Sequence, residues 1–220
     1  MYIPNHRGKT PGEIVEIELY DSASYLFRGM SWLDFHKRTR KFSSLLYACI
    51  EARQGIEYLL FELLVISTGA NLSVEQYRKC VNEKNRFNKT IKQLTPDYEL
   101  LQEFTKILAS VEPSFPKFIY FDNSKLMKTW GVLSQYLHWF GARNLTTENP
   151  AELNIIFNRI ENELNPILIQ ITSGQRAMMQ SKDMVPVVHE ILEKFRTGQI
   201  DADGAKFQLV YLKPITQKYK

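Results

Sequence analysis

The sequence has few cysteines and no long apolar run, and these shortages exclude several classes of protein. Two cysteines among 220 residues are too few for the disulfide framework of a small secreted domain. Neither Cys49 nor Cys80 belongs to a Cys-x-x-Cys pair or has a paired histidine, so no zinc site is predicted. No stretch reaches the roughly 18 apolar residues of a membrane-spanning helix, and we expect no membrane association.

A targeting segment and the motifs of common catalytic sites are also missing. Residues 1–12 carry prolines, glycines and basic side chains where a signal peptide would have an apolar run. We therefore expect a cytoplasmic protein in a reducing compartment. No glycine-rich phosphate loop, HExxH motif or GxSxG motif occurs, and residues 201–204 lack the further acids of a calcium loop. The sequence predicts neither a metal nor a cofactor.

What the sequence does have is a strong helical periodicity, centred on residues 31–68. Apolar residues recur there at steps of three and four and fall on one helical face. They are Phe42, Leu45, Cys49, Ala52, Ile56, Leu59, Leu63 and Ile66. A second apolar row lies beside the first, which is typical of a central helix with several packing partners. Ser31 is its predicted N-cap, and Gly69 follows its predicted end.

The rest of the chain predicts further helices around this one. Their expected ranges are 73–94, 96–111, 122–140, 149–171 with a kink or restart at Pro166, 187–196 and 201–212. Residues 15–19 alternate Val-Glu-Ile-Glu-Leu and could pair with 25–27 as a small β-hairpin, although a frayed helix fits them nearly as well. The predicted fold is all-α, an antiparallel helical bundle. Its predicted domains are an N-terminal extension (1–30), the bundle (31–172) and a C-terminal helical appendage (173–220) packed on the bundle.

Two groups of residues are candidates for catalysis. Arg53 and Glu57 lie four residues apart within the second apolar row, where buried charges should pair with each other. A structural ion pair is the more common explanation of such a pattern.

His138 shares a helical face with Gly131 and Ser134, whose small side chains would let another helix approach. With Arg143 nearby, His138 could act as an acid or base on a phosphodiester, although a hydrogen-bonded interface histidine is more common.

Two basic clusters are candidates for nucleic-acid binding, since a net charge of only +4 makes local clusters matter more than the total. The first cluster consists of Lys37, Arg38, Arg40 and Lys41, and the second includes Arg86, Lys89 and Lys92. If the predicted second helix folds back on the central one, the clusters approach each other, with Tyr47 and Phe87 interleaved. Positive faces with aromatic rings suit nucleic acid through counterion release and base stacking. A solvated lysine-rich helix face is the alternative.

Two segments resemble a known family of helical domains. Residues 42–64, FSSLLYACIEARQGIEYLLFELL, resemble the first long helix of HEPN domains (higher eukaryotes and prokaryotes nucleotide-binding). Residues 129–144, TWGVLSQYLHWFGARN, resemble the later helix that carries the HEPN signature region. The likeness covers about residues 31–165. It implies an antiparallel bundle, frequent homodimers, and roles in RNA cleavage, nucleotide binding, or toxin–antitoxin and antiviral systems.

The sequence departs from the nuclease members of that family at one essential position. Those members carry an arginine, then four to six residues, then a histidine, whereas Leu133, Val132 and Gly131 stand at these distances before His138. The prediction is therefore a HEPN-like binding protein that acts through dimerisation and protein or nucleic-acid partners. A divergent metal-independent ribonuclease, with His138 and either Arg143 or Arg53, is the second hypothesis. A structural helical adaptor is the third.

Overall fold

A computed structural model of the chain describes residues 13, 21–67, 73–76, 78, 97–112, 118–137, 149–174 and 184–216. Helices form the regular structure of these residues, and no strand occurs among them, which confirms the predicted all-α class. The chain divides into two compact units, one of residues 1–63 and 121–173 and the other of residues 64–120 and 174–220. The predicted domain boundaries stay a prediction.

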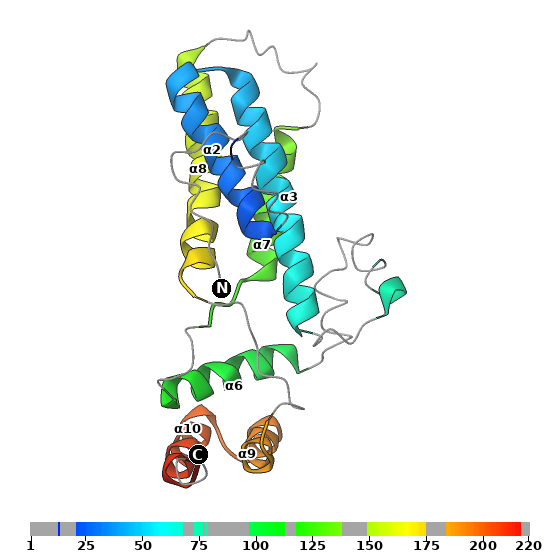
Figure 1. Ribbon diagram of the computed structural model, residues 1–220, viewed down its shortest axis with the longest axis vertical. Helices are drawn as coiled ribbons and strands as arrows, with labels where there is room; N and C mark the ends of the chain where they lie inside the picture. The colour runs from blue at the N-terminus through cyan, green and yellow to red at the C-terminus, as the bar shows by residue number, and fades with distance from the viewer. Residues whose placement is uncertain are drawn as a thin grey trace. The chain divides into compact units, whose positions relative to one another are not determined.

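The first unit is an antiparallel bundle of α2 (Ser22–Thr39), α3 (Phe42–Ser67) up to residue 63, α7 (Asn123–Gln135) and α8 (Pro150–Thr172), which lie alongside one another in Figure 1. The helix directions follow from paired side chains. These pairs are Ser22–Glu62 and Trp32–Tyr47 between α2 and α3, Lys37–Glu161 and Arg40–Asn154 between α2 and α8, and Thr129–Glu163 and Tyr136–Arg159 between α7 and α8. Each of these three pairs of helices therefore runs in opposite directions.

The predicted beginning of the central helix is wrong, because residues 31–68 belong to two helices, α2 and α3. Arg40 adopts a left-handed conformation (φ 55°, ψ 21°), and its N–H bonds to the carbonyl of His36 to close α2. The N-cap of α2 is Asp21, whose carboxylate accepts from the Ser24 N–H at 2.7 Å. Residues 25–27 are helical in α2, so the proposed hairpin is also wrong, and its other half, 15–19, lies outside the described residues.

The other helices of this unit begin where their caps were expected. Asp122 accepts from two N–H groups at the start of α7, and Asn149 accepts from the Ala151 N–H at the start of α8. The helix α7 ends at Gln135, before the predicted position 140. Pro166 does not restart α8, which continues to Thr172. The proline is exposed, and the buried side chains on either side of it hold the helix in the core.

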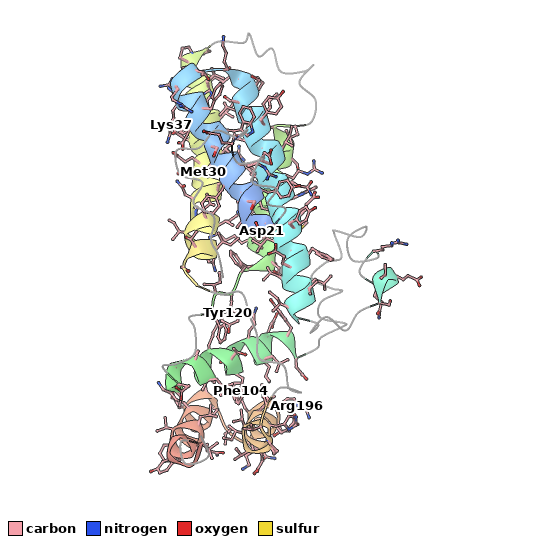
Figure 2. The ribbon with its side chains drawn as sticks, in the orientation of Figure 1. Asp21, Met30, Lys37, Phe104, Tyr120 and Arg196 are labelled. Atoms are coloured by element: carbon pink, nitrogen blue, oxygen red, sulfur yellow. The ribbon has the colours of Figure 1, made fainter. Side chains whose placement is uncertain are left out.

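The second unit contains α6 (Tyr98–Val111), α9 (Pro186–Arg196) and α10 (Ala202–Thr216), close to the predicted helices. The helix α10 packs against both α6 and α9. Phe104 (labelled in Figure 2) is fully buried, and its ring centroid lies 6.0 Å from that of Phe195. Of the predicted helix 73–94, residues 73–76 and 78 are described, and Ser73 accepts from the Gln76 N–H as expected of a cap.

Two glycines let α2 and α3 approach each other closely. A Cβ atom on Gly55 would lie 2.8 Å from Leu26 Cγ and 3.0 Å from its backbone nitrogen, and a Cβ on Gly29 would lie 3.3 Å from the carbonyl oxygen of Ala48. Gly131 was expected to admit a neighbouring helix, but no side chain and no backbone of another element among the described residues lies within 4 Å of such a Cβ. The close helix contact is therefore at α2–α3 and not at Gly131.

We expect Gly55→Ala to destabilise the protein by about 1–3 kcal/mol, because the added methyl group overlaps Leu26 and its backbone. The matched control is Gly131→Ala in the interior of α7, where the methyl meets open space. That substitution should stabilise the protein by about 0.5–1 kcal/mol through its helix propensity. Urea unfolding of both variants tests the contact, and equal stability changes would contradict the close approach.

Candidate nucleic-acid interface

Aromatic side chains form a row along the α2–α3 seam. The rings of Trp32 and Tyr47 lie 4.8 Å apart between centroids, and Phe35 packs edge-on against Trp32 at 5.8 Å. The guanidinium of Arg38 lies 5.9 Å from the centroid of Phe35. We call Trp32, Phe35 and Tyr47 the aromatic row. Tyr47 is 48% exposed, whereas Trp32 and Phe35 are half-buried, so the row is partly accessible from solvent and most accessible at Tyr47.

Helical spacing explains how the row arises. Trp32, Phe35 and Arg38 are three residues apart on α2 and therefore share one face. Because α3 runs antiparallel, this face meets the part of α3 that begins just after the turn, where Tyr47 lies. The seam continues with the ion pair of Arg28 and Glu51, whose Nε and Oε2 atoms are 2.8 Å apart.

The first predicted basic cluster lies at the turn between α2 and α3. We call its members Lys37, Arg38, Arg40 and Lys41 the basic corner, and all four are exposed. Lys37 is neutralised locally, because its ammonium lies 2.9 Å from Glu161 and 3.7 Å from Asp34. The hydrogen bond to Glu161 raises the pKa of Lys37. Figure 2 labels Lys37 near the C-terminal end of α2.

Among the residues that the structure describes, no carboxylate pairs with the remaining cations of the basic corner. Arg40 donates to the neutral side chain of Asn154 at 2.7 Å. Within the described residues, neither Arg38 nor Lys41 forms an ion pair. The first residues of α3 follow Lys41 directly, and the positive end of a helix dipole favours an anion. The corner can therefore hold phosphate groups next to the aromatic row.

A buried histidine that was not among our candidates fixes the shape of this corner. His36 is fully buried, and its Nδ1 lies 3.0 Å from the carbonyl oxygen of Lys41, which can only accept a hydrogen bond. Nδ1 therefore carries the proton and ties the end of α2 to the start of α3. The ring also stacks on Phe157 of α8 at 5.8 Å. Its place on the buried face of α2, three residues after Leu33, is the signal that could have identified it.

The candidate pair Arg53 and Glu57 belongs to a different face, where α3 meets α7. Arg53 Nε lies 3.4 Å from Glu57 Oε1, and the same oxygen accepts from Trp130 Nε1 at 2.9 Å. The guanidinium also lies 4.6 Å from the centroid of the Trp130 ring. Glu57 thus joins the two helices through hydrogen bonds, which fits the structural ion pair that we considered more common.

The other predicted site residues lie outside the described part of the chain. These are His138 and Arg143 of the catalytic hypothesis and Arg86, Lys89 and Lys92 of the second basic cluster. Among the residues that the structure does describe, no group of three or more His, Cys, Asp and Glu side chains could hold a metal ion. None of the described helices is both long enough and apolar enough to cross a membrane.

Comparison with known protein-family models, curated proteins and solved structures finds no match for this chain. The HEPN resemblance therefore stays an expectation.

The Arg53–Glu57–Trp130 network should behave as a structural unit. We expect a double-mutant cycle of Glu57→Gln and Trp130→Phe to show a coupling free energy of about 1 kcal/mol in urea unfolding, since Glu57→Gln removes the negative charge that strengthens the hydrogen bond and Trp130→Phe removes its donor. As a control, Glu57→Gln combined with Trp32→Phe, which lies on the α2 seam, should be additive. Additivity in both cycles would show that the hydrogen bond does not contribute to stability.

We expect the thiol of Cys49 to be unreactive in the folded protein. Burial in the bundle raises the pKa of its thiol from 9.0 to about 12. In a Cys80→Ser variant at pH 8, we expect an aromatic disulfide reagent to modify native Cys49 on the order of 1,000-fold more slowly than the unfolded chain, because the thiolate is the reacting form. The stability due to the protonated thiol should be complete below pH 9 and lost as the pH rises towards 12. Rapid native modification would contradict this burial.

Proposed function

We propose that this protein is a helical binding protein that holds single-stranded nucleic acid on the α2–α3 surface. The main observation behind the proposal is that the rings of the aromatic row lie next to one another, with the guanidinium of Arg38 beside the last ring, Phe35. Accessible ring faces stack on unpaired bases, and adjacent cations neutralise the phosphates of the same strand. A duplex keeps its base faces stacked inside and cannot use the rings in this way.

The electrostatics of the basic corner support the same proposal. Arg38, Arg40 and Lys41 supply three charges that no carboxylate in the described residues pairs with. Release of counterions from three phosphates gives a logarithmic salt slope of about −2, at roughly −0.7 per phosphate of a single strand. Binding should therefore be moderate and sensitive to salt. This is the behaviour of a binding surface and needs no reaction at the site.

The ribonuclease hypothesis receives no support from the described residues. Arg53, one of the two arginines considered for it, is occupied by Glu57 and the Trp130 ring. The HEPN-like character and the dimer implied by the resemblance remain part of our proposal. The bundle is of the general kind that the resemblance implies, and many unrelated functions share such bundles.

The proposal predicts distinct effects for the cations and for the rings. In fluorescence anisotropy with a labelled single-stranded RNA, Arg38→Gln with Lys41→Gln should reduce the magnitude of the salt slope by about 1.4. Tyr47→Ala should weaken binding about 5- to 150-fold while leaving the salt slope unchanged, because it removes a stacking surface and no charge.

Two controls and a comparison complete the experiment. Lys125→Gln with Lys128→Gln removes two exposed charges from α7, and Phe61→Ala removes a partly exposed ring from α3; both should bind like wild type. Duplex RNA should bind more weakly than single-stranded RNA and be insensitive to Tyr47→Ala. The proposal would be wrong if wild-type protein failed to bind single strands at low salt, or if the control pair reduced binding as much as the corner pair.

A further inference from the structure

A second surface, in the other unit, exposes apolar side chains without serving the nucleic-acid site. A groove of about 270 Å³ lies between α9 and α10. Val187 and Ile191 line it from α9, and Phe207 and Tyr211 line it from α10. The two aromatic rings lie 4.6 Å apart between centroids. The groove is thus an apolar channel bounded by two helices.

The exposure of these side chains is unusual for a surface that faces only water. Phe207 is 62% exposed and Tyr211 is 65% exposed, although each is large enough to contribute strongly to a core. Single exposed apolar residues are common, but a contiguous group on two adjacent helices marks an interaction site. Ala205 and Leu209 on the other side of α10 are buried, so the helix already has its core face. The exposed apolar side chains of α10 therefore form a second face of this helix.

The charges at the rim indicate what covers this face. Glu190 and Lys194 line the same groove one helical turn apart and pair with each other at 2.8 Å. The rim therefore carries one charge of each sign, which gives no attraction for a nucleic acid or for a strongly charged peptide. If two copies of α9 meet antiparallel across a two-fold axis, Glu190 of each copy faces Lys194 of the other. The surface is complementary to itself.

We propose that a second copy of this chain docks here, with α9 and α10 of one protomer packing on α9 and α10 of its partner. Phe207 and Tyr211 would fill the partner's groove and lose contact with water. This inference rests on the dimer of the proposed function and assigns it a surface, but it does not depend on the proposed nucleic-acid site, because it uses a different unit and apolar rather than basic residues.

The size of the face sets the expected affinity. The helices α9 and α10 contain 11 and 15 residues, and roughly half of each can face a partner. This is about half of the 20–30 residues per side in a standard stable interface. We therefore expect a reversible dimer with a dissociation constant in the micromolar range.

The first test measures self-association of the full-length protein by sedimentation velocity between about 1 and 200 μM. Wild type should shift from monomer to dimer over this range. Phe207→Glu and Tyr211→Glu should each raise the dissociation constant at least about tenfold, since each places a charge in the apolar channel. Ile169→Glu on α8 is the matched control, because Ile169 is 69% exposed, and it should associate like wild type. A wild-type protein that stayed monomeric would overturn the proposal, as would a dimer insensitive to both groove variants.

Charge exchange provides the second test and identifies the two-fold arrangement. Glu190→Lys alone and Lys194→Glu alone should each weaken self-association, because like charges then face each other across the axis. An equimolar mixture of the two variants should form a heterodimer about as readily as wild type dimerises. In that heterodimer, both lysines of the first variant face glutamates of the second. A mixture that stays monomeric while wild type dimerises would overturn the α9–α9 pairing.

Discussion

The close contact between α2 and α3 is the constraint on which the first unit depends. Gly29 and Gly55 lack the side chains that would hold these helices apart, and a Cβ atom on Gly55 would lie only 2.8 Å from Leu26 Cγ. The turn at Arg40 leaves only two residues between the helices, so their contact begins at once. Every later feature of this surface, from the ion pair of Arg28 and Glu51 to the aromatic row, follows from this proximity.

The bundle distributes its charges according to burial. Where a charged group is buried or half-buried, it has a partner, as Arg28 does in Glu51 and Glu57 does in Trp130. In the basic corner, by contrast, Arg38, Arg40 and Lys41 are exposed to solvent at a helix junction and form no ion pair within the described residues. Such an arrangement costs little stability, because exposed cations keep their hydration. When a nucleic acid binds, phosphate groups replace the water around these cations, and the core need not deform. The basic corner is therefore suitable for a binding role.

Much of the fold could be predicted from the sequence, but the division of the long helix could not. The periodicity of residues 42–66 identified the buried face of α3, and Asp122 and Asn149 identified two helix starts, because capping is a local property. The break at Arg40 carries no glycine or proline, and a left-handed arginine is favoured only by the tertiary contact that the turn allows. For the same reason the prediction that Gly131 admits a neighbouring helix was wrong, because that role depends on which helix lies opposite it.

The two surfaces that we propose differ in the force that drives them, and salt separates these forces. The basic corner gains free energy from counterion release, which declines as salt rises. The α9–α10 groove gains most of its free energy from the burial of apolar area, which salt does not weaken. Because Lys194 already pairs with Glu190 in the protomer, dimer formation exchanges one ion pair for another and adds little electrostatic energy. High salt should therefore release the nucleic acid and leave the dimer in place, so that each surface can be studied without the other.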